Sequence, residues 1–330
     1  MTTSFLARTL AGRPPPQRME LAERCLSAGR YREGWALYEA RREIGDYPEH
    51  HLPTPAPAWH PALPLAGRRL LLWHEQGLGD TIQMLRFVPL VVRRGAHVVL
   101  AVQPPLRRLA ASLPCVSSVV TDGEAFEGVD YHCPLMSLPH LLGIRLATLP
   151  AAVPYLAIPR GCVDAWRARL GPRSAPRIGI VCSGKPDNSL DAWRSLPARE
   201  FAPLLERLDL EFHVLQSEIR AADREYLAGM PNVRLHTDAL TDLCETAALA
   251  MQMDCIITVC TVVAHLAGAL ALPTCILLST RAHWLWLADR ADSPWYPTVR
   301  LLRQRAEHDW RPVVSDAAAM MRQRFPGVGH

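Results

Sequence analysis

Residues 69–83 read RLLLWHEQGLGDTIQ, and this stretch decides the fold. The apolar run Leu70–Trp73 ends in the polar loop Glu75–Asp80, and a pattern with helical spacing extends over Thr81–Arg94. A second apolar run follows at Val98–Val102. This order is typical of a β-α-β unit in a parallel sheet that helices cover. We therefore predict an α/β fold with the loop at the carboxyl end of a strand.

The same rhythm continues along the rest of the chain. Further strands are predicted at Ser118–Thr121, Ile178–Cys182, Phe212–Gln216, Cys255–Val259 and Thr274–Leu278. Further helices are predicted at Ala198–Leu208, Leu240–Met253, Val262–Leu270 and Trp310–Arg324. The segment Asp130–Leu142 is predicted to be strand or helix. A chain of 330 residues exceeds what one core usually organises. We predict two Rossmann-like domains, residues 59–158 and 159–330, with ligands bound between the carboxyl ends of their sheets.

The first 58 residues have a different pattern. An amphipathic helical pair is predicted over residues 17–45, and its second part, AGRYREGWALYE, resembles a single tetratricopeptide (TPR) unit. One such unit cannot bury both its faces, so it packs on the rest of the chain or belongs to a longer array. A plain helical hairpin is the alternative. A proline-rich linker over residues 51–64 follows it.

The charge, the cysteine pattern and the N-terminus of the sequence argue against several classes of protein. The formal net charge of +4 is spread along the chain, which argues against a dedicated nucleic-acid binder. Nine cysteines without a Cys-x-x-Cys pair indicate reduced thiols and no zinc site. The N-terminus lacks the apolar core of a signal peptide, so we expect a cytoplasmic protein.

The segment Cys255–Thr280 contains no charged residue and is long enough to cross a bilayer. A membrane helix would have to include Pro273, His265 and many β-branched residues. A buried strand-helix-strand unit of a parallel sheet has the same continuous apolar character. We predict the second arrangement and no transmembrane segment.

The loop after the first strand is the first candidate site. Gly77 and Gly79 let the backbone turn tightly near a ligand, with Glu75 and Gln76 beside them. The loop lacks the third glycine of a dinucleotide fingerprint and the lysine of a phosphate-binding loop. Asp80 either caps the helix that follows or acts as a carboxylate that takes a proton from an acceptor hydroxyl.

The second candidate site lies where the strand Cys255–Val259 leads into a helix. The start of that helix offers free N–H groups to an anion such as a diphosphate, and Cys260 and Thr261 stand at this point. His265 lies four residues further on the same face, where it is either a buried, hydrogen-bonded histidine or a ligand contact.

The third candidate site follows the strand Ile178–Cys182. Ser183 and Gly184 end that strand, and Lys185 and Arg194 are cations that either face solvent or neutralise a leaving phosphate. All three candidate sites fall at strand carboxyl ends, where ligands of such sheets bind.

Several stretches together resemble a known group. Residues 71–83, 132–135, 137–139, 261–270 and 292–297 look like those of the tetratricopeptide-linked bacterial glycosyltransferases related to the ADP-heptose:lipopolysaccharide heptosyltransferases. The resemblance implies a GT-B fold and inverting, metal-independent transfer without a cofactor. It also implies that the first domain binds the acceptor and the second the nucleotide sugar.

The resemblance also suggests residue roles. Asp80 matches the proposed general base of the heptosyltransferases, Arg194 stands near their phosphate-binding lysine, and Thr261 with His265 matches their nucleotide-side helix start. The chain departs from the family at Cys260, where an aspartate is usual, and at Cys182, where a tryptophan is usual. The missing aspartate would contact the donor sugar, so Cys260 bears on donor identity and on activity.

Three functional hypotheses follow. The first is transfer of a sugar from a nucleotide-diphosphate donor to a protein or glycan hydroxyl, with the N-terminal helical unit as a possible docking element for the acceptor. The second is a nucleotide-binding or scaffold protein without catalysis, which Cys260 favours. The third is an epimerase or hydrolase of sugar nucleotides with the same fold.

Overall fold

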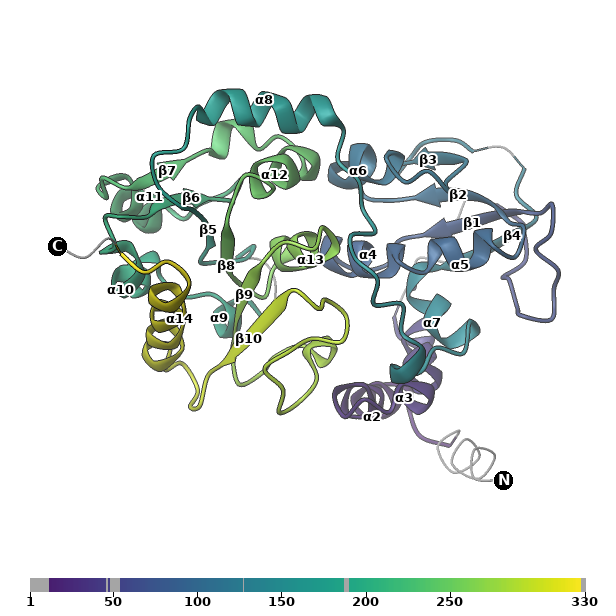
Figure 1. Ribbon diagram of the computed structural model, residues 1–330. Helices are drawn as coiled ribbons and strands as arrows, with labels where there is room; N and C mark the ends of the chain where they lie inside the picture. The colour runs from purple at the N-terminus through teal and green to yellow at the C-terminus, as the bar shows by residue number, and fades with distance from the viewer. Residues whose placement is uncertain (1–11, 46, 48–53, 127, 187–189, 328–330) are drawn as a thin grey trace.

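The structure, a computed structural model, describes residues 12–45, 47, 54–126, 128–186 and 190–327. Its first half contains a sheet of four parallel strands in the order β3-β2-β1-β4 (Figure 1). The strands are β1 (Arg69–Trp73), β2 (His97–Ala101), β3 (Ser118–Val120) and β4 (Tyr131–Pro134). The helices, with short 3₁₀ helices labelled η, are α4 (Leu78–Leu85), α5 (Val88–Val92), η3 (Pro104–Leu106), α6 (Arg107–Ala111), η4 (Leu135–Ser137), α7 (Leu138–Leu141) and η5 (Leu146–Thr148).

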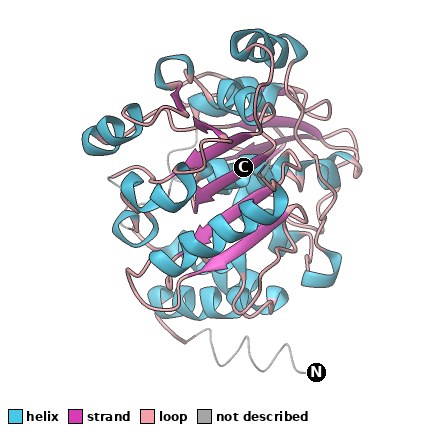
Figure 2. Ribbon diagram, turned by 60° about the vertical axis from the view of Figure 1, so that its left-hand side comes forward, coloured by secondary structure: helices cyan, strands magenta, loops and turns pink. Residues whose placement is uncertain are grey.

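The second half contains a sheet of six parallel strands in the order β10-β9-β8-β5-β6-β7. The strands are β5 (Arg177–Val181), β6 (Glu211–Val214), β7 (Val233–Leu235), β8 (Cys255–Val259), β9 (Thr274–Leu278) and β10 (Val299–Arg303). The helices are α8 (Arg160–Leu170), α9 (Asp191–Arg194), η6 (Ala198–Phe201), α10 (Ala202–Leu205), α11 (Ala221–Ala228), η7 (Thr237–Ala239), α12 (Leu243–Ala250), α13 (Val262–Ala269), η8 (Trp284–Trp286) and α14 (Arg311–Arg324). Helices lie on both sides of the strands (Figure 2).

The helix after β1 differs from the prediction. It begins at Leu78 rather than Thr81, and the predicted range is divided into α4 and α5. Pro89 stands in the first turn of α5, where its missing N–H costs nothing, and it could not continue α4 without losing a hydrogen bond. The prediction of a single helix over Thr81–Arg94 is therefore wrong.

The uncharged segment Cys255–Thr280 forms β8, α13 and β9, which confirms the predicted strand-helix-strand unit. Both strands are buried along their whole length. None of the helices in the described parts of the chain is long and apolar enough to cross a membrane.

The N-terminal residues form a helical hairpin of α2 (Pro15–Ser27), α3 (Tyr31–Tyr38) and η1 (Glu39–Glu43), which confirms the predicted helical pair. The hairpin packs against the second half, where Trp35 meets Trp284 edge to face, with ring centroids 5.1 Å apart. It also binds the first half through an ion pair between Arg41 and Glu75. The hairpin therefore bridges the two halves, whereas its kinship with tetratricopeptide units stays a prediction.

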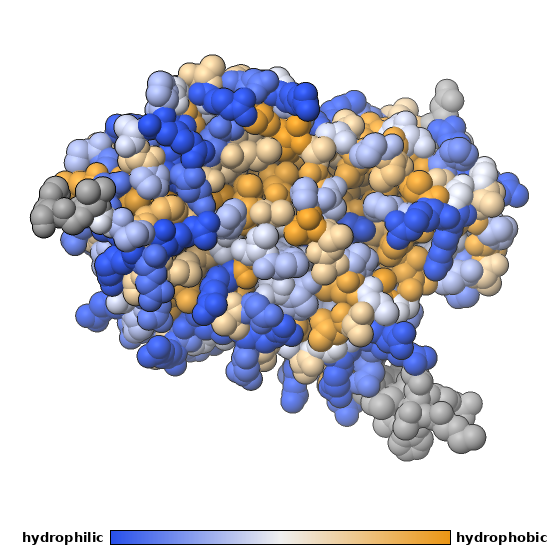
Figure 3. All heavy atoms as spheres, viewed as in Figure 1, coloured by the Kyte–Doolittle hydropathy of each residue, from blue (hydrophilic) through white to orange (hydrophobic). Residues whose placement is uncertain are grey.

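The two halves meet along α4 and α13 (Figure 1). One continuous hydrophobic core contains buried residues of the first sheet, the hairpin, the segment 284–296 and one side of β9 and β10. The rest of the second sheet has its own core, and a small cluster on the first sheet is separate. Figure 3 shows hydrophobic residues along the middle of one face, where the halves meet, and hydrophilic residues towards its lower edge. The contact between the halves thus brings the carboxyl ends of β1 and β8 together.

Candidate functional site

Asp80 has a fixed place at the start of α4. Its carboxylate accepts the backbone N–H of Gly77 at 3.1 Å, so Asp80 caps the helix from its third position rather than from the residue before it. Burial raises its pKa from 3.8 to about 6, and Glu75 adds to this effect, while the nearby positive charge of Arg194 opposes it. A carboxyl group with this pKa is ionised at pH 7 and basic enough to take a proton.

Glu75 and Gln76 serve the structure of the loop. The Glu75 side chain, 1% exposed, accepts hydrogen bonds from Arg41 Nε at 2.9 Å and Nη2 at 2.8 Å. Tyr47 and the backbone N–H of Met136 also donate to it. Gln76 donates to the Tyr38 hydroxyl at 3.0 Å. Both side chains therefore attach the loop to its surroundings, and the loop presents Asp80 to the second half of the molecule.

Gly79 is the closest link between the two halves of the site. A methyl group built at Gly79 would lie 2.7 Å from Cδ2 of His265 in α13. The His265 ring is held by a hydrogen bond of 3.1 Å between Nδ1 and the hydroxyl of Tyr296. Burial lowers the pKa of His265 to about 3, and neighbouring positive charges add to this effect, so the imidazole is neutral. Glycine is needed here because any side chain would collide with this ring.

Arg194 lies at the centre of the candidate site. Its Nη1 donates to the backbone oxygen of Cys260 at 3.2 Å, and its Nη2 would be 2.5 Å from a methyl group built at Gly184. Its positive charge also affects the pKa values of Asp80, His265 and the buried His283. One guanidinium therefore contacts the loop after β5 and the loop after β8.

The loop after β5 is held beside Arg194 by hydrogen bonds. Ser183 accepts a hydrogen bond from Gln216 at 3.0 Å, and the N–H of Gly184 donates to Ser195 Oγ at 2.9 Å. Ser195 in turn donates to Asp191 at 2.7 Å. Lys185 is exposed, and it forms no hydrogen bond or ion pair within the described residues. The structure thus brings Ser183, Gly184 and Arg194 together and leaves Lys185 at the rim.

Thr261 and Cys260 lie at the start of α13. Thr261 is the residue before the helix, buried, with its hydroxyl 3.4 Å from that of Thr258. Cys260 Sγ accepts a hydrogen bond from Trp286 Nε1 at 3.1 Å, and burial raises the pKa of this thiol. A neutral thiol in this position cannot act as a carboxylate would.

Sequence reasoning missed three contributors to this site: Arg41, His283 and Trp286. Arg41 could not be found, because nothing in a helix pattern indicates an ion pair with a loop 34 residues away. His283 could have been found, since it follows β9 in the same way as the three candidate sites follow their strands.

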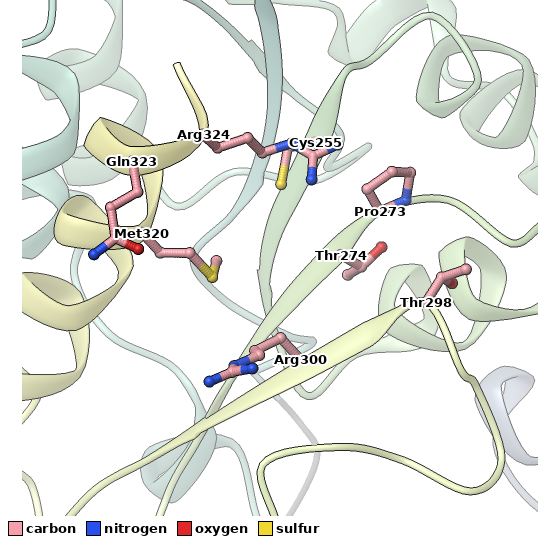
Figure 4. Close-up of a pocket in the computed structure, with 8 residues that line it drawn as sticks. All are labelled: Cys255, Pro273, Thr274, Thr298, Arg300, Met320, Gln323 and Arg324. Carbon is pink, nitrogen blue, oxygen red and sulfur yellow. The ribbon is translucent and has the colours of Figure 1, made fainter. Parts of the chain in front are cut away.

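Two hollows lie outside this cluster. The first, of about 350 Å³, is lined by Cys255, Thr274, Arg300 and Arg324 among others (Figure 4). Cys255 and Thr274 begin their strands, so this hollow is at the amino ends of the sheet, opposite to Thr261. The second, of about 480 Å³, borders the candidate site through Ser195.

The two parallel sheets and their contact define the class of fold, which is that of the GT-B glycosyltransferases. The solved E. coli ADP-heptose LPS heptosyltransferase II matches with a TM-score of 0.56 and 14% identity, over 77% of this chain and 99% of that one. A family 9 glycosyl transferase from Veillonella parvula matches with a TM-score of 0.57 and 11% identity, over 81% and 92%. E. coli heptosyltransferase WaaC with ADP-2-deoxy-2-fluoro heptose matches with a TM-score of 0.51 and 11% identity, over 78% and 99%. At these identities the shared property is the fold.

Among curated proteins, Protein FlbA of Caulobacter vibrioides is 26% identical over 328 residues, which cover 90% of this chain and 53% of that protein. The chain therefore spans about half the length of this relative. No protein family model matches the chain.

Proposed function

We propose that this chain transfers a sugar from a nucleotide-diphosphate sugar to a hydroxyl group of a protein or glycan. The transfer inverts the configuration at the sugar and needs no metal ion. The proposal rests on one observation above all. Asp80, a carboxyl group whose pKa is about 6, lies at the start of α4, which packs against α13, and Arg194 donates to the backbone oxygen of Cys260 just before α13.

Each side of the cluster has a part in this reaction. The acceptor hydroxyl gives its proton to the Asp80 carboxylate while its oxygen forms a bond with the anomeric carbon of the sugar. The bond from that carbon to the diphosphate breaks, and the diphosphate leaves with the electron pair. Attack from the face opposite to the leaving group inverts the anomeric carbon.

The leaving diphosphate gains negative charge, which Arg194 and Lys185 stabilise as cations. The free N–H groups at the start of α13, beside Thr261, add a partial positive charge at the same edge. These groups supply the charge that a metal ion supplies in other transferases. Neutral His265 cannot contribute charge, so we assign it to hydrogen bonding and to packing against Gly79.

Binding and transfer test the proposal separately. Titration calorimetry with ADP, UDP and GDP and with ADP-glucose, UDP-glucose, UDP-N-acetylglucosamine and GDP-mannose should find at least one sugar nucleotide that binds. Transfer from that donor to acceptors in a cell extract should be lost in Asp80→Asn, which keeps the oxygen that accepts the Gly77 N–H. The matched control is Asp164→Asn, an exposed carboxylate on α8, which should transfer like the wild type. Absence of binding to every member of the panel would refute the proposal.

Cys260 supports a second candidate, a nucleotide-binding protein without catalysis. Its thiol is neutral and already accepts a hydrogen bond from Trp286. Under this hypothesis the wild type binds a sugar nucleotide tightly, yet no transfer is detected and Asp80→Asn changes nothing in the cell.

A further inference from the structure

The loop after β9 contains His283, a residue near the candidate site that no sequence motif indicated. β9 lies next to β8 in the parallel sheet, so its carboxyl end is at the same edge as Thr261. His283 follows β9 by five residues and directly precedes η8. A positive charge on His283 would lower the pKa of His265, so the two rings lie within electrostatic range of each other.

Several buried nitrogen atoms at this edge lack hydrogen-bond partners among the described residues. They include Nδ1 of His283, Nε1 of Trp284 and Nε of Arg194. An unpaired buried polar group costs free energy, so folded proteins keep few of them. Unpaired atoms on different loops at one edge of the sheet are typical of a place where a polar ligand binds.

The charge states of the two groups differ. Burial, together with the nearby charge of Arg194, lowers the pKa of His283 to about 4, so His283 is neutral at pH 7. A neutral imidazole forms hydrogen bonds but offers no charge to a phosphate. Arg194 is the group that suits a diphosphate, and His283 suits an uncharged hydroxyl.

The neighbours of His283 hold it in place. Its ring packs on Trp284, with centroids 4.7 Å apart, and Trp284 packs edge to face on Trp35 and Tyr38 of the N-terminal hairpin. On the other side, Trp286 donates to Cys260 Sγ. A side chain fixed by its surroundings can select a ligand by geometry.

We infer that His283 hydrogen-bonds a hydroxyl group of the sugar carried by the nucleotide donor, while Arg194 binds the diphosphate of the same molecule. This inference rests on the proposed function. The thiol of Cys260 is a weak hydrogen-bonding group, so recognition of the sugar at this edge falls to another side chain. His283 is neutral and its buried Nδ1 lacks a partner among the described residues, whereas Nδ1 of His265 bonds the Tyr296 hydroxyl and its Nε2 lies against Gly79.

Matched titrations of a diphosphate and its sugar conjugate test this role. The wild type, His283→Ala and His283→Asn are titrated with the sugar nucleotide that binds best in the panel above and with its nucleoside diphosphate. We expect His283→Ala to weaken binding of the sugar nucleotide about tenfold and binding of the diphosphate less than twofold. His283→Asn keeps a polar atom near the position of Nδ1 and should recover most of the loss. His140→Ala, an exposed histidine on α7, is the control.

The outcomes distinguish a failure of this role of His283 from a failure of the proposed function. Equal affinity of the wild type and His283→Ala for the sugar nucleotide overturns the inference, and so does an equal loss for sugar nucleotide and diphosphate. Binding of diphosphates but of no sugar nucleotide to the wild type also overturns it. If the wild type binds no member of the panel, the proposed function itself fails. Thermal melting checks the folding of each variant, and His283→Asn carries the test if His283→Ala unfolds.

Discussion

At the scale of single residues, Asp80 and Glu75 show how neighbours give the same chemical group different roles. Glu75 is ion-paired with Arg41 and 1% exposed, so it is an anchor. Asp80 accepts the backbone N–H of Gly77, and hydrogen bonds from the backbone and the charge of Arg194 only partly offset the effect of burial on its pKa. Glu75 and Asp80 are five positions apart in the sequence, yet only the Asp80 carboxylate can exchange a proton near neutral pH.

The pH dependence of transfer follows from the pKa of Asp80, which is about 6. The base must be ionised, so we expect kcat/KM to rise with pH, to level off above pH 7 and to fall about tenfold for each pH unit well below 6. The measurement is a pH profile of kcat/KM between pH 4.5 and 8.5. A profile without a group that titrates near pH 6 would contradict the role of Asp80.

The same pKa shift predicts a change in stability. Because burial raises the folded-state pKa of Asp80, its contribution to stability is fully present below pH 3.8 and is lost as the pH rises through 6. Asp80→Asn should therefore not lower the melting temperature at pH 7, and this result would separate lost catalysis from lost folding.

Gly79 is the second position where one residue decides the site. Gly79→Ala places a methyl group 2.7 Å from the His265 ring, which Tyr296 holds in place. We expect a loss of about 1–3 kcal/mol in unfolding free energy and weaker donor binding, because α4 and α13 must separate. Urea denaturation and calorimetry measure the two effects. Gly128→Ala, where a methyl group meets nothing within 4 Å, should leave both unchanged.

At the scale of elements, the connection between the hairpin and the loop after β1 is a buried ion pair. Arg41 is 6% exposed, and it donates to both carboxylate oxygens of Glu75. Removing Arg41 leaves the buried Glu75 carboxylate without its ion pair, which typically costs about 3–5 kcal/mol. Removing the charge of Glu75 costs less, because Arg41 keeps its ion pair with Glu39 at 2.8 Å.

A double-mutant cycle measures this connection. We expect Arg41→Met to destabilise the protein strongly and Glu75→Gln to destabilise it less, and the double variant to lose less than the sum of the two. Denaturant midpoints for the four proteins give the coupling energy. Additive losses would show that the ion pair does not hold the loop to the hairpin.

At the scale of the whole molecule, two contacts besides the packing of α4 on α13 join the halves near the site. Arg86, buried at the end of α4, lies over the rings of Tyr155, Trp295 and Tyr296 at 4.8 to 4.9 Å and donates to the backbone oxygen of Trp295 at 2.8 Å. The N-terminal hairpin forms the second contact. It is part of the body that holds the site, so a docking role for the acceptor would involve its outer face.

Substitutions of Trp35 test whether the N-terminal hairpin stabilises the rest of the protein. It is 1% exposed and contacts Trp284 of the other half, so Trp35→Ala should cost about 3–5 kcal/mol in unfolding free energy. Trp35→Phe should cost much less, because the indole N–H of Trp35 has no partner within the described residues. Denaturation by urea measures both variants. A loss below about 1 kcal/mol in Trp35→Ala would mean that the hairpin does not support the body.

The sequence by itself determined the strands and helices next to the site, since the period of apolar residues reports which faces are buried. It predicted β1, β8, α13 and β9 correctly, and it placed Asp80, Arg194 and Thr261 at strand ends that meet in one cluster. It missed β7, β10, α8 and α11, whose patterns are short or mixed with charged residues.

Only the tertiary structure decided what each of those side chains does. Glu75 became an anchor because Arg41, from another element, reaches it, and Asp80 acquired its pKa because packing removes water from around it. His283 gained its place because β9 runs beside β8. Burial, charge and hydrogen bonding at this site come from residues far apart in the chain, and a local pattern carries no information about such partners.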